Sequence, residues 1–153
     1  MSLPGRPGKL QNYMDIAEVV ARRSHDADTK VGAILVKNGS GAIIATGFNG
    51  FARGADDEKL PNNRPDKYQY IIHAETNIVA HCARHGISME DCMLVCTLTP
   101  CVSCMRLLWQ CGITEVIAKD LYRDIEAIQK MKDIAIVLLK TVEGFHALTY
   151  AEA

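Results

Sequence analysis

The first third of the chain changes from a helical to an extended hydrophobic pattern. Over residues 10–24, apolar side chains recur three or four positions apart, which predicts an amphipathic helix with one buried face. They are Leu10, Tyr13, Met14, Ala17, Val20 and Ala21. Two short apolar runs follow at 31–36 and 42–48. The Asn38-Gly39 pair between them is a strong turn signal, so these two runs are predicted to form a β-hairpin.

The second half of the chain alternates between helical and strand patterns. The predicted elements are a helix at 73–85 ended by Gly86, a strand at 92–98, a helix at 100–111, a strand at 113–120, a helix at 123–132, a strand at 134–140 and a short closing helix in the tail. Strands connected by helices run parallel in one sheet. With the hairpin, this gives a five-stranded mixed sheet whose last three strands are mutually parallel. Helices would cover both faces, so the predicted fold class is α/β, a three-layer α/β/α sandwich.

Two segments follow neither period. The polar stretch 49–69 is a long loop, and loops of this length inside a domain are often functional or mobile. Residues 1–9 contain two glycines and two prolines and are predicted to be a flexible lead-in. Because no repeat or boundary in composition interrupts the remainder, residues 10–153 are predicted to form a single domain.

Composition narrows the class of protein. Hydrophobic residues make up 48% of the chain and charged residues 23%, as in ordinary soluble proteins. No apolar run is long enough to span a membrane, and no secretory pattern is present. Six cysteines without such a signal favour a reducing compartment, so a cytoplasmic location is predicted. A net charge of −1 disfavours long nucleic acid, which is held by a strongly basic face, but leaves small anionic ligands open.

Two short motifs carry candidate chemistry. HAETN at 73–77 opens one predicted helix, and PCVSC at 100–104 opens the next. Cys101 and Cys104 are three positions apart, so both sulfurs lie on one helix face, in a first turn whose dipole favours thiolates. With the imidazole of His73, they supply three protein ligands and leave one position for water, as in a catalytic zinc site.

Glu75 is the candidate acid–base group. It follows His73 by two residues, so the two side chains diverge, and Glu75 can flank the water while His73 reaches the metal. A carboxylate in that position can take a proton from water and pass it on. Zinc lowers the pKa of bound water to about 7. These groups suit hydrolytic attack on an aromatic amidine carbon.

Each motif alone also has an ordinary explanation. A Cys-x-x-Cys pair occurs in redox sites and structural zinc sites, and a histidine at a helix start often acts as a cap. Cys82, Cys92 and Cys96 are better explained as buried thiols. The joint pattern is specific, because H-x-E and P-C-x-x-C open two helices separated by one strand. It is the signature of zinc-dependent deaminases.

With these residues, the chain resembles the cytidine deaminase superfamily, most closely its deoxycytidylate (dCMP) deaminase branch. The similar segments are TKVGAILV (29–36), GFNGFARG (47–54), HAETN (73–77) and TLTPCVSC (97–104). The metal motifs are shared across the superfamily, whereas GFNGFARG points to the nucleotide branch. Phe48 departs mildly from the Tyr or Trp more usual there. The resemblance implies a cytidine deaminase-like fold and hydrolysis of dCMP to dUMP and ammonia, which would supply dUMP for thymidylate synthesis.

The resemblance also implies roles for individual residues. Asn49 would contact the deoxyribose and the base, and the backbone amide of Ala74 would hold the pyrimidine. Arg53 would bind the phosphate, with Lys30 and Tyr122 as weaker phosphate-side candidates. Residues 31–72 contain no Cys or His, so one catalytic zinc ion per chain is expected, without a second, structural one. The resemblance further implies a homo-oligomer, with a hexamer favoured, and dCTP (activator) and dTTP (inhibitor) as candidate effectors, together with Mg²⁺.

Charge in the long polar segment supports a small anionic substrate independently. A guanidinium offers two parallel donors to a phosphate, which makes Arg the usual residue for such recognition. Arg53, Arg64 and Lys67 all lie in this segment. Arg53 is expected to act on the ligand, whereas Arg64 and Lys67 are interpreted as solvated surface charges.

Two alternatives stay open from the sequence. A deaminase of a base within RNA or DNA, or of another cytosine nucleotide, would carry the same metal motifs, and for RNA or DNA it would need a basic surface and an open pocket. A non-catalytic zinc-stabilised binding module would need a fourth protein ligand.

Overall fold

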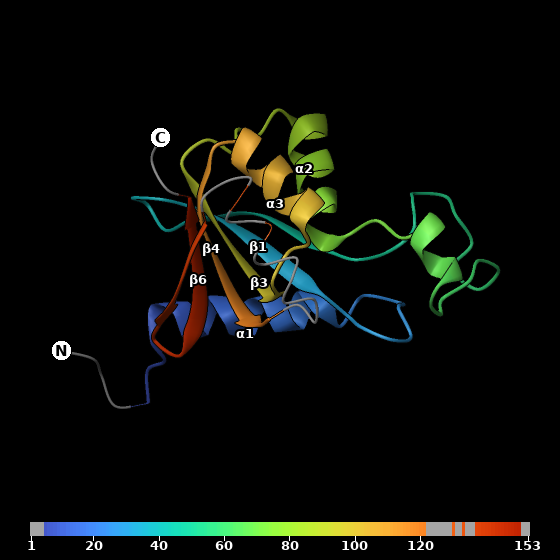
Figure 1. Ribbon diagram of the computed structural model, residues 1–153, viewed down its shortest axis with the longest axis horizontal. Helices are drawn as coiled ribbons and strands as arrows, with labels where there is room; N and C mark the ends of the chain where they lie inside the picture. The colour runs from blue at the N-terminus through green and yellow to red at the C-terminus, as the bar shows by residue number, and fades with distance from the viewer. Residues whose placement is uncertain (1–4, 122–129, 131–132, 134–136, 151–153) are drawn as a thin grey trace.

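The computed structural model describes residues 5–121, 130, 133 and 137–150. Among these residues, six strands form one sheet in the order β2-β1-β3-β4-β6-β5 (Figure 1). The elements are α1 (Lys9–Ala21), β1 (Gly32–Lys37), β2 (Ile43–Phe48), the short 3-10 helix η1 (Asp66–Gln69), α2 (Ala74–His85), β3 (Cys92–Leu98), α3 (Val102–Gln110), β4 (Ile113–Asp120), β5 (Val137–Val142) and β6 (Phe145–Tyr150). The predicted helix at 123–132 lies almost entirely outside the described residues.

The β1–β2 hairpin and the parallel β3 and β4 agree with the sequence prediction, which did not include a pairing of β1 with β3. β1 and β2 form an antiparallel hairpin in which Gly32 is opposite Phe48, and the loop between them contains Asn38 and Gly39. β1 is also antiparallel to β3. β3 and β4 are parallel, joined by α3. β1 lies between two strands, and its first five residues are buried, which explains its continuous apolar run.

The sequence prediction of five strands with a helical tail is wrong, because the tail forms β6. Glu143 and Gly144 both have positive φ, 51° and 85°, and they connect β5 to β6 as a two-residue hairpin loop. Such loops need positive φ at both central residues and are usually recognised as Asn-Gly or Asp-Gly, so Glu-Gly gave no signal. β6 is antiparallel to both β4 and β5. β5 therefore runs parallel to β3 and β4, as predicted, but is not adjacent to β4.

Helices cover both faces of the sheet, which confirms the three-layer arrangement. Figure 1 shows α1 along one face and α2 with α3 on the other. One hydrophobic cluster joins α2 and α3 to the sheet around Ile78, Leu94 and Leu108, and a second joins α1 to the sheet around Met14 and Ile34. All five of these side chains are fully buried. The sheet therefore separates two cores, and α2 and α3 lie side by side on one of them.

Two glycines let the helices approach the sheet closely. A Cβ on Gly32 in β1 would lie 2.1 Å from the carbonyl oxygen of Ala17 in α1. A Cβ on Gly47 in β2 would lie 2.7 Å from the carbonyl oxygen of Ala74, the first residue of α2. Because both obstructing atoms are backbone, no side-chain rotation could make room. Gly47 thus helps to set the position of the helix that begins beside the candidate metal ligands.

Replacing Gly32 by Ala is expected to destabilise the fold by about 1–3 kcal/mol, the usual cost of overpacking a tight interior. The new methyl group would also lie 2.5 Å from the amide nitrogen of Ala21, so α1 would have to move away from β1. Urea denaturation measures the change. Gly50→Ala is the matched control, since its nearest neighbour, the His25 ring, is 3.5 Å away. Equal urea midpoints for Gly32→Ala and Gly50→Ala would contradict the close approach of α1 to β1.

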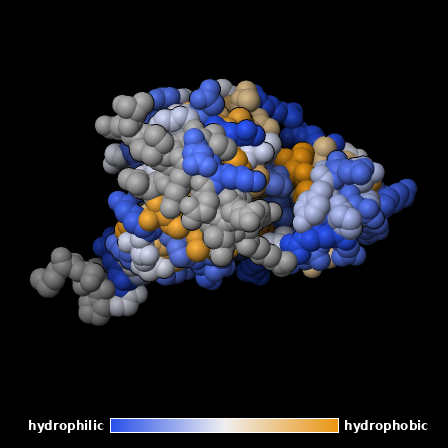
Figure 2. Space-filling model, in the orientation of Figure 1, coloured by the Kyte–Doolittle hydropathy of each residue, from blue (hydrophilic) through white to orange (hydrophobic). Residues whose placement is uncertain are grey.

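The long polar segment projects from the sandwich beyond β2. Figure 1 shows that the projecting part includes η1, and the space-filling view shows mainly hydrophilic residues over it (Figure 2). A bridge between Gly50 and Ile72 closes its base. Within the described part of the chain, no helix combines the length and apolar character needed to cross a membrane.

Candidate active site

The N-termini of α2 and α3 bring one histidine and two cysteines together. His73 and Cys101 are the N-cap residues of the two helices, both in extended backbone conformation, and Cys104 lies in the first turn of α3. The Nδ1 atom of His73 lies 3.5 Å from the Cys101 sulfur and 3.4 Å from the Cys104 sulfur. Of the described residues, these three form a group whose ligand atoms all lie within 4.8 Å of one another.

The two thiols and the imidazole shift one another's pKa values, mainly through hydrogen bonds. Hydrogen bonding with Cys104 outweighs burial and, together with His73, lowers the pKa of Cys101 to about 4. Hydrogen bonding with Cys101 and burial raise the pKa of Cys104. The hydrogen bond to Cys101 also raises the pKa of His73, against the effect of burial. Helix N-termini stabilise negative charge nearby, which adds to the preference of Cys101 for the thiolate form.

This donor set fits zinc. One imidazole nitrogen and two sulfurs are the ligand types that zinc prefers, and three protein ligands are typical of catalytic sites. A fourth protein ligand does not belong to the group among the described residues, which disfavours a structural four-ligand site. The remaining cysteines predicted to be buried thiols, Cys82, Cys92 and Cys96, are 0–2% exposed and unpaired by disulfides.

Glu75 is a buried carboxylate beside the metal group. It lies in the first turn of α2, and only 4% of the residue is exposed. Burial raises its pKa to about 7, although its backbone hydrogen bond and the charge of His73 act in the opposite direction. A carboxyl group with such a pKa can both accept and release a proton near neutral pH.

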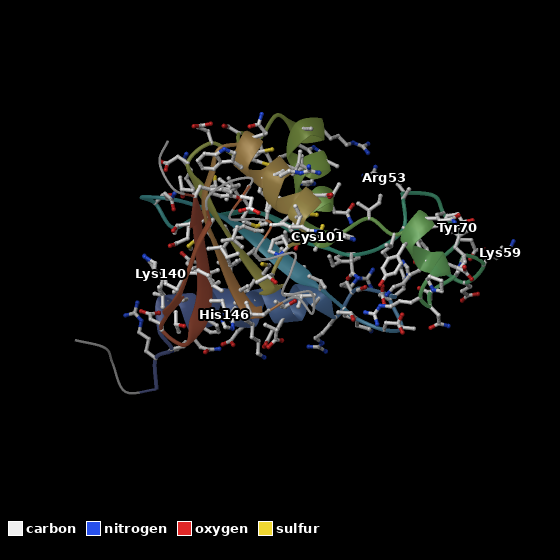
Figure 3. All side chains as sticks on the ribbon, in the orientation of Figure 1. Arg53, Lys59, Tyr70, Cys101, Lys140 and His146 are labelled. Carbon is white, nitrogen blue, oxygen red and sulfur yellow. The ribbon has the colours of Figure 1, made fainter. Side chains whose placement is uncertain are left out.

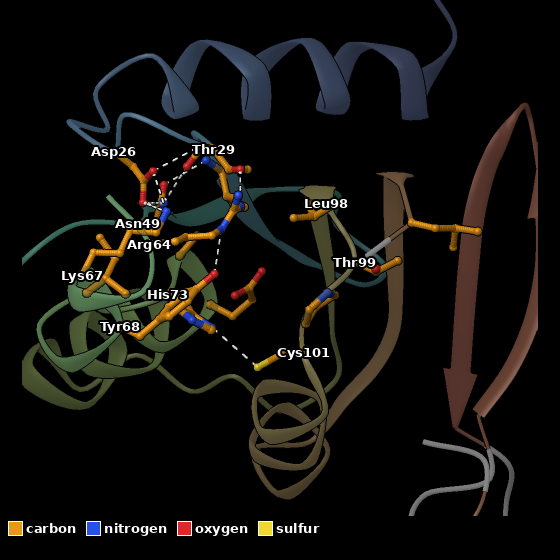
Figure 4. A pocket seen from close by; sticks show the side chains of 16 residues that line it. Asp26, Thr29, Asn49, Arg64, Lys67, Tyr68, His73, Leu98, Thr99 and Cys101 are labelled. Atoms are coloured by element: carbon orange, nitrogen blue, oxygen red, sulfur yellow. Dashed lines mark hydrogen bonds and ion pairs between the residues drawn. The ribbon is translucent and has the colours of Figure 1, made fainter. Parts of the chain in front are cut away.

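His73, Cys101 and Glu75 line one cavity of about 430 Å³, a size suited to a small-molecule ligand. Figure 4 shows His73 and Cys101 on one side and Leu98 and Thr99 close by. The residues that line the cavity are Asp26, Thr29, Val31, Asn49, Arg64, Lys67, Tyr68, Ile71, His73, Ala74, Glu75, Leu98, Thr99, Pro100, Cys101 and Leu121.

A buried ion pair forms another wall of this cavity. The ammonium nitrogen of Lys67 lies 2.8 Å from both carboxylate oxygens of Asp26 and 3.2 Å from Asp28. Burial opposes ionisation of Asp26, but hydrogen bonds from Lys67 and from the amides of Thr29 and Asp28 outweigh it and lower the pKa of Asp26. Lys67 is only 3% exposed, so the interpretation of this lysine as a solvated surface charge is wrong.

Asn49 is fixed by the same network. Its Nδ2 donates to the carbonyl oxygen of Thr29 at 2.9 Å and to Asp26 at 3.4 Å, and its Oδ1 accepts from the amide of Val31 at 2.8 Å. Both amide hydrogens are therefore used within the protein. An amide oxygen has two lone pairs, so Oδ1 keeps one acceptor position, and Asn49 lines the cavity.

The structure separates the predicted substrate-binding residues into two groups. Asn49 and Ala74 line the cavity. Arg53 is exposed and is absent from the lining residues, and Figure 3 shows it on the projecting loop, apart from Cys101. Lys30 lines a different, smaller depression of about 230 Å³. Tyr122 lies outside the described residues.

Sequence reasoning missed the residues that the segment after α1 supplies, Asp26 and Thr29. The sequence offered one signal. Two aspartates lie in HDAD at 25–28, just before the apolar run, and a single lysine, Lys67, lies between residues 60 and 72. Nothing in local spacing indicates that these charges meet across 41 positions. The sequence pattern therefore identified the metal-binding residues but not the residues after α1 that line the same cavity.

Fold and site together are those of an α/β/α metalloprotein with a three-ligand metal group and an adjacent buried carboxylate. A model of the cytidine and deoxycytidylate deaminase zinc-binding region matches residues 7–119. The chain therefore belongs to the cytidine and deoxycytidylate deaminase family.

Individual relatives agree with this assignment. Human deoxycytidylate deaminase is 35% identical over 119 residues, covering 73% of this chain and 65% of the human protein. The mouse enzyme is 36% identical over 121 residues, covering 74% of this chain and 66% of its own length. The dCMP deaminase of cyanophage S-TIM5, solved in complex with dCMP and dUMP, is 30% identical with a TM-score of 0.68, covering 84% of this chain and 93% of that one. The chain thus spans about 65% of the mammalian relatives' length.

Proposed function

We propose that the protein is a zinc-dependent dCMP deaminase, which converts dCMP and water to dUMP and ammonia. The observation that carries the proposal is a buried carboxylate, Glu75, lining the same cavity as two members of a three-ligand metal group. Similarity to dCMP deaminases supports the substrate, since the phage relative was solved with dCMP and dUMP.

His73, Cys101 and Cys104 would hold the zinc ion, one per chain. When bound, zinc acts as a Lewis acid that lowers the pKa of the attacking water. Two thiolates and a neutral imidazole would balance the charge of the ion. Thr76 contributes to this arrangement, because its hydroxyl lies 3.7 Å from the Cys104 sulfur.

Glu75 would move the protons of the reaction. It would take one proton from the attacking water and deliver it to N3 of the pyrimidine as C4 becomes tetrahedral. It would then take the remaining proton from the new C4 hydroxyl and give it to the amine, so that the C4–N bond breaks, ammonia leaves and C4 becomes a carbonyl. Its burial keeps the carboxylate away from bulk water, so protons pass between substrate and Glu75.

Ala74 and Asn49 would orient the nucleotide. Ala74 is the first residue of α2, and the first amides of a helix have no acceptor within it, so its N–H can bind the pyrimidine. The free acceptor position on Asn49 Oδ1 suits a deoxyribose hydroxyl. Because the Asn49 side chain is held in place, its Oδ1 would accept a hydrogen bond only from a donor group on the ligand.

Turnover tests the proposal directly. Protein loaded with one equivalent of zinc should release ammonia from dCMP, and protein stripped by a chelator should regain activity when zinc returns. Cytidine and a transfer RNA serve as competing substrates, because the same metal motifs occur in deaminases of nucleosides and of RNA bases. Loaded protein that leaves dCMP intact, with and without dCTP, would refute the proposal.

The proposal includes the assembly and control that the resemblance implies. We expect a homo-oligomer, with a hexamer favoured, activation by dCTP and inhibition by dTTP in the presence of Mg²⁺. Light scattering gives the oligomer mass, and rates measured with each effector test the control. A monomeric protein, or one that does not respond to dCTP and dTTP, would leave the proposed reaction unaffected.

A further inference from the structure

Arg64 lies on the cavity wall with its guanidinium held by two neutral hydroxyl groups. Its Nε donates to the Tyr68 hydroxyl at 2.7 Å, and its Nη2 donates to the Thr29 hydroxyl at 3.1 Å. Figure 4 shows Arg64, which precedes η1, bonded to Tyr68 of η1 and to Thr29 in the segment after α1. All three residues line the cavity that holds His73 and Glu75. The side chain is thus oriented by contacts that do not neutralise its charge.

The neighbouring charges leave Arg64 without an ionic partner. Lys67 contacts both Asp26 and Asp28, so the nearest carboxylates already share a cation. Asp28 meets Arg64 only at the backbone, where it accepts the amide N–H at 3.2 Å. Among the described residues, none of the ion pairs within 4.0 Å includes the Arg64 guanidinium.

The unused donors are directed by this anchoring. A guanidinium has five N–H groups, and the bonds to Tyr68 and Thr29 use two of them. Both hydrogens on Nη1 and one on Nη2 remain for a ligand. Adjacent parallel N–H groups match the oxygens of a phosphate better than those of any neutral group.

We propose that Arg64, and not Arg53, binds the 5′-phosphate of the nucleotide, with Thr29 and Tyr68 as positioning residues. This inference rests on the proposed function for the identity of the base, but the anion-binding role does not depend on turnover. It makes the site selective for nucleoside monophosphates over nucleosides. Both arginines are exposed, but Arg64 lines the cavity and Arg53 does not.

Binding of the product nucleotide isolates this role from catalysis. Calorimetric titration of the zinc-loaded protein with dUMP and with 2′-deoxyuridine compares ligands that differ only in the phosphate. Arg64→Gln should weaken dUMP binding about 10- to 100-fold, as expected for a lost hydrogen-bonded charge, and leave deoxyuridine binding unchanged. Arg64→Lys should give an intermediate loss, because it keeps the charge but not the paired donors.

Matched variants separate binding from structure. Lys59→Gln removes an exposed cation at the tip of the projecting segment (Figure 3) and should change neither affinity. Tyr68→Phe removes one anchor while keeping the charge, so it should retain most of the dUMP affinity. If Arg64 merely joins its loop to the segment after α1, Thr29→Val, which removes that bond, and Arg64→Gln will have similar effects, and both ligands will weaken together.

The outcomes distinguish the two proposals. Equal affinity of the wild-type protein for dUMP and deoxyuridine, an unchanged Arg64→Gln variant, or a selective loss in Arg53→Gln would overturn the role of Arg64. A protein that prefers dUMP through Arg64 but releases no ammonia from dCMP would keep this inference and refute the proposed reaction.

Discussion

Replacing Glu75 by Gln should lower the rate of dCMP deamination by about 10²- to 10⁴-fold, the usual contribution of a positioned acid–base group. Gln has nearly the same shape as Glu but cannot accept and return a proton at neutral pH. The metal ligands are separate residues, so zinc content should stay at one ion per chain. Turnover with dCMP and elemental analysis of the purified variant measure the two quantities.

Stability provides a check on the same variant. Because burial raises the pKa of Glu75 to about 7, the folded protein is not stabilised by this carboxylate in its ionised form. The thermal midpoint of Glu75→Gln should therefore be no lower than that of the wild type. Glu58→Gln, in the exposed loop, is the control for loss of one negative charge. Full activity in Glu75→Gln, or loss of zinc in parallel with activity, would remove Glu75 from the proposed proton transfers.

Replacing Lys67 by Met should destabilise the protein by about 3–5 kcal/mol, because removal of one partner leaves a buried charge uncompensated. The Lys67 and Asp26 side chains are only 4% and 2% exposed. Lys59→Met is the matched control, since the Lys59 side chain is 83% exposed and its contact with Asp56 is 3.8 Å long. Exposed pairs of that kind contribute about 0–1 kcal/mol. Urea denaturation at pH 7 compares the two variants.

The effect of Lys67→Met should depend on pH. Asp26 has a lowered pKa in the folded wild type, so its contribution is present above the unfolded pKa of about 3.9 and is lost as pH falls through the folded value. Without Lys67, burial would raise that pKa. The stability difference between wild type and variant should therefore shrink as pH is lowered from 8 towards 4. A difference that is constant over this range would argue against the ion pair as its source.

A double-mutant cycle isolates the pair itself. Asp26→Asn combined with Lys67→Met removes both charges, so the double variant should be less destabilised than the sum of the single variants. The hydrogen bond from Asn49 to Asp26 predicts a second effect. Single substitutions at this pair should weaken nucleotide binding without changing zinc content, because neither residue is a metal ligand.

Local patterns predicted the elements and the metal group well. The ligands His73 and Cys101 are helix N-caps and Cys104 follows within one turn, so short motifs at helix starts contain nearly all of the required geometry. The helix, hairpin and strand periods over residues 10–120 likewise depend on neighbours in sequence. β6 was missed because its turn uses Glu143 where Asn or Asp is usual.

Long-range pairing accounts for what sequence reasoning could not predict. Lys67 looks like a surface lysine in a polar loop, and only the fold places it against Asp26. Arg53 and Arg64 are chemically equivalent in the sequence, and they differ because Tyr68 and Thr29 orient one of them into the cavity. Charge in a loop therefore does not indicate which of its side chains lines the cavity.

The metal ligands and the residues on the other side of the cavity are held by different hydrophobic cores. The metal ligands extend from α2 and α3, whose apolar faces pack on one side of the sheet. Asp26 and Thr29 follow α1, which packs on the opposite side. Loosening of α1 would therefore release the nucleotide while the zinc ion stayed in place, so a preparation can be fully loaded with metal and still bind substrate poorly.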